Sequence, residues 1–308
     1  MLVKNQTSIK YFYILTFSGD TIYKPFISIL FFFIYLVGVL VNSSIITVIC
    51  LDIQLHKPMY LFISNLSIVD IFYTSVTVPK LLHLLLSGNH IVSFSQCYTQ
   101  FYFFVLVVFA EGILLFIMAY DRYVAICIPL HYHKILSRRN CTLITFGIWA
   151  TAFLNALLFV VLALNMSSCH SNIIHQFSCD PKSLTRTTCT TTPMFSEIVG
   201  IEILFFAFIP VLGTCISYVN IFSVIFKMKS KERRRKAFST CSSHITVITI
   251  YYGTALIGYL IPPYSDVLDS VFNTVYATII PMINPIIYSL QNANVQSALF
   301  RFVKLLYF

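Results

Sequence analysis

Charged residues are scarce in this sequence. Only 10% of the 308 residues are Asp, Glu, Lys or Arg, whereas an ordinary soluble domain carries about 25%. The shortage of charge argues against a soluble enzyme of this size, and a hydrophobic fraction of 58% excludes a disordered chain. Most of the surface is therefore expected to face lipid.

A cleaved signal peptide is not expected either, because no short apolar region near the N-terminus ends in a small-residue cleavage site. Seven apolar segments are present instead, each with at least the roughly 20 residues that a membrane-spanning helix needs. They lie at about 25–50, 58–82, 96–120, 141–164, 194–226, 237–261 and 271–290. The first is expected to act as an uncleaved signal anchor, and an odd number of spans places the two termini on opposite sides of the membrane.

The Lys and Arg residues between the spans predict the orientation, because positive segments close to span ends tend to stay in the cytoplasm. Of the 20 basic residues, 14 fall on one side of the predicted membrane, seven of them between Lys227 and Lys236. The expected organisation is an extracellular N-terminus at 1–24, a seven-span domain at 25–290 and a cytoplasmic tail at 291–308. The net charge of +9 is then a topology signal, and it does not predict binding to nucleic acid.

Glycosylation sequons and cysteines on the predicted outer side agree with this orientation. Asn5 and Asn165 each begin a sequon. Four of the nine cysteines fall where conditions are oxidising, and sequence leaves their three possible pairings open: Cys97, Cys169, Cys179 and Cys189. The others are expected to be small buried hydrophobic side chains: Cys50, Cys127, Cys141, Cys215 and Cys241.

Internal repeats are not evident, which disfavours a transporter, and no line of polar residues crosses the whole membrane as in a channel. A few polar side chains do lie within the spans, where they are costly and usually functional. Asp70 and Glu111, at mid-depth, are expected to share a water-filled pocket with Asn42 and Asn284, in which a cation or a shared proton offsets their repulsion. A hydrogen-bonded polar core that only keeps the helices in register is the alternative.

A candidate two-state element lies where the third span reaches the cytoplasm. Asp121 and Arg122, followed by Tyr123, predict a local ion pair whose opening would expose the guanidinium to a cytoplasmic partner. In the seventh span, Pro285 lies between Asn284 and Tyr288 and predicts a kink that can act as a hinge.

Three histidines at the predicted cytoplasmic edge have no nucleophile or metal-ligating cluster beside them in the sequence. We therefore expect His131, His133 and His244 to be solvated or to face a cytoplasmic partner. The sequence predicts no enzyme and no cofactor.

Four motifs, in order, resemble those of the rhodopsin-like G-protein-coupled receptors and, among them, the odorant receptors. They are LHKPMY at 55–60 with SNLS at 64–67 and Asp70, MAYDRYVAIC at 118–127 with PLHY at 129–132, KAFSTCSSH at 236–244, and PMINPIIYSL at 281–290. The resemblance covers nearly the whole chain. Three departures, at Val41, Tyr251 and Gln291, leave the family interpretation unchanged.

The resemblance implies an all-α membrane protein, a seven-transmembrane helix bundle with a short amphipathic C-terminal helix. It also implies that Cys97 pairs with Cys179 and Cys169 with Cys189. In the family, Asp70 and Glu111 lie together in a sodium or polar site, and no other metal is implied.

The resemblance places an odorant pocket in the outer half of the bundle, and helical spacing supplies a suitable surface there. One face of the third span carries Phe104, Val105, Val108, Phe109 and Gly112, and one face of the sixth carries Tyr252, Ala255, Leu256 and Tyr259. With Glu202, Phe206, Thr274 and Thr278 they would form an apolar cavity for a small organic ligand, although ordinary helix packing uses the same residue types. Glu202 is the residue expected to recognise an amine or another hydrogen-bond donor.

The function implied by the resemblance is that of an odorant receptor at the plasma membrane that activates a stimulatory G protein and raises cyclic AMP. Arg122, Tyr218 and Tyr288 would receive the G protein. The basic run from Lys227 to Lys236 has two open interpretations, contact with the G protein and attraction to anionic lipid. A non-olfactory receptor for a metabolite or amine is the alternative, and a channel or transporter is the alternative from another class.

Overall fold

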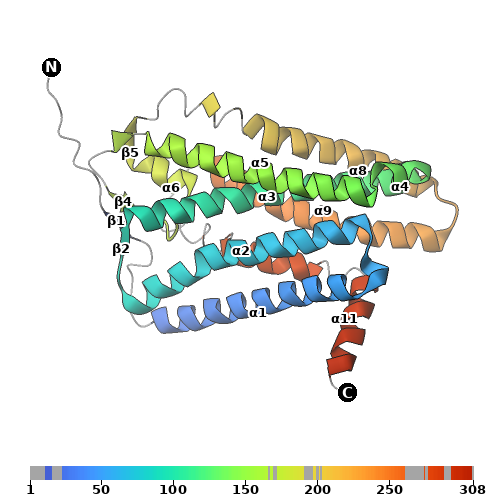
Figure 1. The fold of residues 1–308 in the computed structure, drawn as a ribbon, viewed down its shortest axis with the longest axis horizontal. Coiled ribbons are helices and arrows are strands. Elements are labelled where there is room, and N and C mark those ends of the chain that lie inside the picture. Colours follow the sequence, from blue (N-terminus) through green and yellow to red (C-terminus); the bar gives the residue numbers. More distant parts are fainter. Residues whose placement is uncertain are drawn as a thin grey trace.

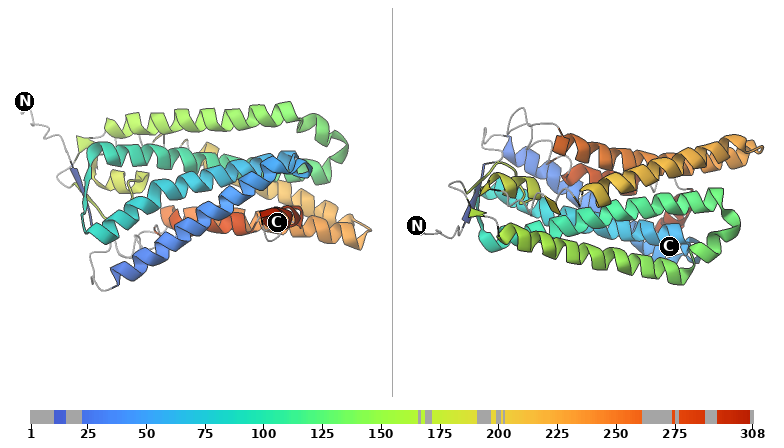
Figure 2. Two further views of the ribbon diagram at one scale, coloured as in Figure 1. Left: turned by 60° about the horizontal axis from the view of Figure 1, so that its bottom comes forward. Right: turned by 90° about the horizontal axis from the view of Figure 1, so that it is seen from above.

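The computed structural model describes residues 11–15, 23–165, 167–168, 172–190, 197–198, 201, 203–260, 274, 277–287 and 293–306. This part of the chain is mostly helical, and its long helices run side by side along one axis (Figure 1). Strands β1 and β2 lie at one end of the bundle, and helix α11 lies toward the other. The two further views confirm that the long helices form one bundle (Figure 2).

Five helical segments are long and apolar enough to cross a membrane, and they contain most of the first five predicted spans. They are α1 (Lys24–Leu51), α2 (Pro58–Ser87), α3 (Phe94–Cys127), α5 (Arg138–Leu164) and the segment Leu204–Lys227, which joins the π-helical turn η3 (Ile203–Phe208) to α8 (Ile209–Lys227). The helix α9 (Lys231–Leu260) contains nearly all of the sixth predicted span. A shorter apolar helix, Ala277–Ile287, covers the middle of the seventh.

Local sequence explains where several of these helices begin and end. Ser93 and Gln96 form a reciprocal capping box at the start of α3, and Pro58 occupies the first turn of α2. Helix α2 ends at Gly88, whose φ of 63° is a left-handed conformation that favours glycine. Helix α3 continues to Cys127, beyond the predicted end at 120, and stops two residues before Pro129.

Helix α9 begins at Lys231, six residues before the predicted sixth span. The residues from 231 to 236 are Lys, Glu and Arg, which are good helix formers with no Gly or Pro to interrupt them. Charge excluded these residues from the predicted membrane span but did not prevent them from being helical.

Burial differs strongly between the inner and outer helices of the bundle. Helices α2 and α3 supply large, fully buried side chains such as Phe62, Tyr73 and Leu114. Helix α1 instead exposes Phe26 and Phe33 along its outer face. Apolar surface of this extent on spanning-length helices needs lipid as its solvent.

The five cysteines outside the predicted outer segments do not share one environment. Cys141 and Cys241 are buried, as expected. The expectation is wrong for Cys50 and Cys215, which are exposed on the outer surfaces of α1 and α8. Because lipid surrounds the bundle, an apolar cysteine can face outward there as readily as inward.

Short strands gather at one end of the bundle, where sequence predicted only connecting segments. Strand β1 (Tyr11–Ile14) pairs antiparallel with β2 (Ile91–Ser93) and parallel with β4 (Ile173–Ile174), and β3 (Ser167–Ser168) pairs with β5 (Thr188–Thr190). Phe12 and Ile14 point inward, while Tyr11 and Tyr13 point outward, which is the period of two that a half-buried strand requires. The expected N-terminal segment 1–24 therefore contributes a strand to the cap over the bundle.

The remaining short elements connect the long helices or, in the case of α11, follow the last of them. They are the 3₁₀ turns η1 (Ile53–Leu55) and η2 (Pro129–His131), α4 (Tyr132–Ile135), α6 (Pro181–Arg186) and α11 (Ala293–Leu306). Arg301 of α11 forms an ion pair with Asp52, which precedes η1. The Gln54 backbone N–H and the Arg301 guanidinium lower the pKa of the Asp52 carboxyl.

Gly213 allows α3 and α8 to pack closely, and its replacement is the first testable consequence of the fold. A Cβ added at Gly213 would lie 2.8 Å from Phe116 Cε2, too close for a real contact. Gly213→Ala is therefore expected to destabilise the protein by about 1–3 kcal/mol, as overpacking does. Thermal unfolding of the purified protein in detergent measures this change.

Gly147→Ala is the matched control, because no heavy atom lies within 4 Å of a Cβ added at this interior position of α5. It should be neutral or stabilise the helix by up to about 1 kcal/mol. Equal unfolding temperatures for the two variants would contradict the importance of the close approach.

Candidate functional site

A buried polar cluster joins three helices near the middle of the bundle. Asn284 Nδ2 donates hydrogen bonds to Asp70 Oδ1 and to Glu111 Oε1, both at 3.1 Å. The three side chains come from the helix Ala277–Ile287, α2 and α3, and all are almost completely buried. The structure therefore brings the two predicted carboxyl groups together through one amide.

Asn42, the fourth predicted member of this cluster, has a different role from the one expected. Its Nδ2 donates to the Gly38 carbonyl at 3.1 Å and to the Pro281 carbonyl at 3.5 Å, so it joins α1 to the helix Ala277–Ile287 and does not bond either carboxyl group. Within the described residues, Asn42 Oδ1 and Glu111 Oε2 are buried acceptors without a hydrogen-bond partner. Oxygen acceptors of this kind suit a hard cation such as sodium.

Asn284→Ala tests the polar cluster. The substitution removes the donor shared by two buried carboxyl groups, and leaving such groups unsatisfied costs about 3 kcal/mol. We expect a lower unfolding temperature and less protein at the cell surface, measured by calorimetry and by surface staining. Asn220→Ala is the control, because Asn220 is exposed on α8 and bonds only the carbonyl of Ile216 within the described residues. Equal stability of the two variants would argue against the bridging role of Asn284.

A second cluster lies at the end of α3, where the chain turns into η2. Tyr132 donates a hydrogen bond to Asp121 Oδ1 at 2.9 Å, and Arg122 lies 3.5 Å from Asp121 Oδ2. Burial and the Asp121 carboxylate both raise the pKa of Tyr132, which keeps its hydroxyl protonated as a donor. The predicted pairing of Asp121 with Arg122 is present, and Tyr132 is a partner that the sequence analysis missed.

Beside this cluster, α8 and α9 are joined through their side chains. The Tyr218 hydroxyl and His244 Nδ1 are 2.5 Å apart in a buried hydrogen bond. The expectation of a solvated His244 is wrong, because the side chain is completely buried. Since α9 begins 13 residues earlier, His244 lies more than three turns inside the helix and not at its edge.

Arg122 lies between these two sets of residues. Its side chain is 18% exposed, its Nε has no hydrogen-bond partner within the described residues, and it interacts electrostatically with Tyr218 and His244. Tyr123 packs against the same apolar cluster as Tyr218. The guanidinium therefore has unused hydrogen-bonding capacity. Tyr288, expected in the same group, lies outside the described residues, while Pro285 is buried.

The predicted ligand-binding face of α3 packs against aromatic rings of neighbouring helices. Phe104 contacts Tyr73 at 5.6 Å between ring centroids, and Phe109 contacts Phe206 at 4.5 Å. Val105 is buried and Val108 partly buried, whereas Phe206 is 41% exposed. The structure thus places Phe206 on the predicted surface.

Hydrogen bonds tie the same face of α3 to α9. Tyr252 donates to the Gly112 carbonyl at 3.2 Å, and Tyr251, which the sequence analysis did not assign to this surface, donates to the Val108 carbonyl at 2.8 Å. Thr274 and Thr278 are buried. Glu202 and the side chains of Ala255, Leu256 and Tyr259 lie outside the described part of the structure.

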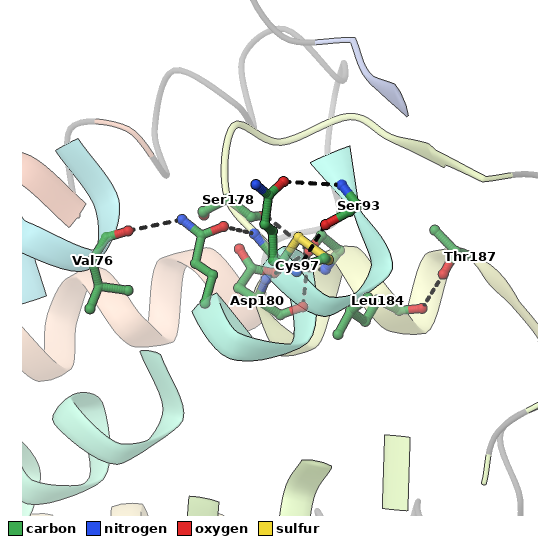
Figure 3. The surroundings of a disulfide bond; sticks show 11 residues. Val76, Ser93, Cys97, Ser178, Asp180, Leu184 and Thr187 are labelled. Carbon is green, nitrogen blue, oxygen red and sulfur yellow. Dashed lines mark hydrogen bonds between the residues drawn. A yellow bond between two sulfur atoms is a disulfide. The ribbon is translucent and has the colours of Figure 1, made fainter. Parts of the chain in front are cut away.

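A disulfide fixes the segment before α6 to the start of α3 (Figure 3). It joins Cys97 to Cys179, the pairing that the resemblance implied. Gln100, missed by sequence reasoning, accepts from the Cys179 N–H at 3.1 Å and donates to the Val76 carbonyl at 3.0 Å, so one amide supports the loop and α2 together. The Asp180 carboxylate then accepts the Ser183 N–H at 2.7 Å and caps α6.

The other predicted modifications fall mostly outside this region. Cys169 and Asn5 lie outside the described residues, and Cys189 lies in β5 without a described side chain. Asn165 is exposed at the end of α5, where its amide donates to the Val161 carbonyl at 2.9 Å.

Comparisons with known proteins identify relatives along nearly the entire chain. A family model described as "Olfactory receptor" matches residues 31–305. The chain is 39% identical to olfactory receptor 5B21 of Mus musculus over 307 residues, which cover 99% of this chain and 96% of that receptor. It is 42% identical to olfactory receptor 1G1 of Gorilla gorilla gorilla over 303 residues, which cover 96% and 95% of the two chains.

Olfactory receptor 5B12 of Homo sapiens is 39% identical over 298 residues, which cover 96% of this chain and 95% of that receptor. These relatives are receptors, which confirms the expectation that the chain is not an enzyme. A match of this length, carried by a protein with several membrane-crossing helices, leads to one conclusion: the chain belongs to the olfactory receptor family of G-protein-coupled receptors and is a multi-pass membrane protein.

Proposed function

We propose that this protein is a plasma-membrane odorant receptor that binds small organic ligands in the outer half of the bundle and activates a stimulatory G protein. The observation that carries the coupling part is the environment of Arg122. Its guanidinium lies at the end of α3 between the Asp121–Tyr132 pair and the Tyr218–His244 pair, with unused donors. Charge-assisted donors in such a position can bond a partner once the neighbouring helices separate.

The proposal includes seven spans, with α9 and the helix Ala277–Ile287 within the sixth and seventh. The spans form the domain at 25–290, with the segment 1–24 extracellular and the tail 291–308 cytoplasmic. Helix α11 supports a membrane-surface location for the tail, because Val295 and Ala298 are buried while Phe300 is 76% exposed. The concentration of basic residues in the segments that would face the cytoplasm supports the orientation.

The proposed ligand surface is the aromatic face shared by α3, η3 and α9. Phe104, Phe109 and Phe206 supply apolar area, and Tyr251 and Tyr252 connect that area to α9. We assign Val105, Val108, Ala255, Tyr259 and Thr274 to the same surface, and Glu202 to the recognition of an amine or another hydrogen-bond donor. An apolar surface with few polar groups suits a small organic ligand.

Activation would follow from a difference in ligand affinity between two arrangements of α8 and α9. A ligand shifts such an equilibrium only if it binds one arrangement more tightly. The Tyr251 and Tyr252 hydrogen bonds to α3 and the Tyr218–His244 bond between α8 and α9 are contacts that can differ between the arrangements. Pro285 would provide a hinge and Tyr288 a G-protein contact.

Three further assignments complete the proposal. The cluster of Asp70, Glu111 and Asn284, with Asn42 beside it, would be the sodium or polar site, in which the unpaired acceptors Glu111 Oε2 and Asn42 Oδ1 would meet the cation. Cys169 and Cys189 would form a second disulfide. Asn5 and Asn165 would carry glycans on the outer side.

The test is a cyclic AMP assay in cells that co-express the receptor and an olfactory-type stimulatory G protein, with a panel of small volatile and water-soluble ligands. A ligand-dependent rise supports the proposal, and Glu202→Gln should selectively weaken responses to amines because it removes the carboxylate charge. Glu197→Gln is the matched control, since Glu197 is exposed on the same predicted outer side. Silence across the panel, despite surface staining and with responses through other G proteins, would contradict the stimulatory coupling.

A further inference from the structure

A cavity of about 410 Å³ lies between the ends of α8 and α9 that carry the basic run. Its apolar wall is formed by Ile225 and Phe226 of α8 and by Phe238 of α9. Its polar rim is formed by Lys231, Arg234 and Arg235, all on α9 and all exposed. Neither the predicted ligand surface nor the Arg122 cluster includes these residues.

The exposed face of α8 shows which way this cavity opens. Leu212, Ile216, Val219 and Phe226 are 49%, 54%, 66% and 71% exposed, and their spacing places them on one side of the helix. Ile225 is on the opposite, buried side. Because an exposed apolar stripe along a spanning helix faces lipid, the Phe226 edge of the cavity opens toward the membrane and away from the interior of the bundle.

A partly buried ring, Phe222, packs against both aromatic side chains of the wall and links the two helices. The ring centroids of Phe222 and Phe226 are 6.3 Å apart, and those of Phe222 and Phe238 are 6.0 Å apart. The membrane-crossing segment ends at Lys227, so this apolar wall lies at the depth where hydrocarbon gives way to headgroups. Phe226 and Phe238, which are 71% and 50% exposed, thus present to the membrane a surface on which an acyl chain can lie.

The charge on the rim has one sign. Lys231, Arg234 and Arg235 contribute three cations, and Glu232, the acidic residue of this turn, does not line the cavity. An occupant must therefore be anionic at one end and apolar at the other. Of the molecules present at this depth, an anionic phospholipid has both properties.

We propose that the groove between α8 and α9 is a binding site for an anionic phospholipid of the cytoplasmic leaflet. The lipid phosphate lies against Lys231, Arg234 and Arg235, and an acyl chain lies along Phe226 and Phe238. This assignment divides the basic run into two parts. The side chains on the rim hold one lipid, whereas Lys229 and Arg233, which do not line the cavity, contribute only general attraction to the surface.

Native mass spectrometry of the purified receptor tests the site, with dioleoyl-phosphatidylserine and dioleoyl-phosphatidylcholine added at equal concentrations. The wild-type receptor should retain phosphatidylserine in preference. The double substitution Arg234→Gln and Arg235→Gln should reduce this retention about tenfold or more, because it removes two charge-assisted contacts. The matched control, Lys229→Gln with Arg233→Gln, removes the same charge and should reduce retention by about twofold or less.

The apolar wall has its own control pair. Phe226→Ala should weaken phosphatidylserine retention, whereas Phe146→Ala, at an equally exposed position on α5, should not. Soluble glycerophosphoserine should fail to displace the lipid, because it has no acyl chain. Unfolding temperatures of all variants should match the wild type, since the substituted side chains are exposed.

Three results would overturn the proposal. Equal loss in the two charge pairs would show diffuse attraction, and equal retention of the two lipids would show that the headgroup is not recognised. Wild-type lipid retention by the Arg234→Gln and Arg235→Gln variant, combined with reduced binding of purified G protein, would assign these residues to a protein contact instead.

Discussion

Arg122→Ala is expected to abolish the ligand-dependent rise in cyclic AMP while the receptor still reaches the cell surface. Arg122 pairs with Asp121 at 3.5 Å and has an unpartnered Nε within the described residues, so little of its hydrogen-bonding capacity is used in this arrangement. The Asp121 carboxylate, which is only 1% exposed, keeps the hydrogen bond from Tyr132 when Arg122 is replaced, so it is not left without a partner, and surface staining checks that the variant still folds. The effect on signalling should be far larger, since no other described side chain between the Asp121–Tyr132 and Tyr218–His244 pairs can replace the guanidinium.

Two companion variants make this result specific. Arg122→Lys should recover only part of the signal, because an ammonium group is a point charge and lacks the planar fork of a guanidinium. Arg139→Ala is the control, since Arg139 is exposed at the start of α5 and forms no described ion pair. A full cyclic AMP response from Arg122→Ala at wild-type surface levels would remove Arg122 from the proposed coupling site.

The spanning helices could be predicted because the property that a membrane requires of them, a continuous apolar segment, can be recognised in consecutive residues. About 20 apolar residues in succession leave a membrane helix as the suitable structure. The ends were less predictable, since hydropathy marks the edge of the membrane and not the end of the helix. Helices α3 and α9 both extend past the apolar boundary, where no Gly or Pro stops them.

The polar cluster could be predicted in membership but not in connectivity. The free-energy cost of placing polar groups in a membrane span is enough to identify Asp70, Glu111 and Asn284. Such groups usually face the interior of the bundle and have a function there. The packing of three helices determines which amide bridges the carboxyl groups. That packing cannot be predicted from the sequence of any one helix. Asn42 has the same chemistry as Asn284, yet within the described part of the chain its amide donates only to the backbone carbonyls of Gly38 and Pro281.

Most contacts that sequence reasoning missed join different helices or loops, and only Tyr132 and Asp121 among those discussed are close in the chain. Gln100 joins Val76 to Cys179, and His244 meets Tyr218 across two helices. Strand β1 was missed because four residues of alternating burial are too short to distinguish from a loop. Its pairing partners lie near residues 92 and 173, and only the folded chain brings them together.

Loss of the Cys97–Cys179 disulfide is the second large effect expected. The two residues are 82 positions apart, and closing a loop of that length stabilises a fold by about 4.5 kcal/mol in the chain-entropy description. Cys97 and Cys179 are also completely buried beside Gln100, so the support for the segment before α6 depends on this bond. Cys97→Ser and Cys179→Ser should each remove most receptor from the cell surface, measured by surface staining against total expression.

The double substitution Cys97→Ser with Cys179→Ser should be no worse than either single substitution, because each one alone already breaks the bond. Cys50→Ser is the control, since Cys50 is an exposed free cysteine on α1. Near-normal surface expression of the single variants would mean that the strands β1, β2 and β4, with the capped helix α6, hold the outer end without the covalent link. In that case the sheet, and not the disulfide, would be the structure that positions the ligand surface.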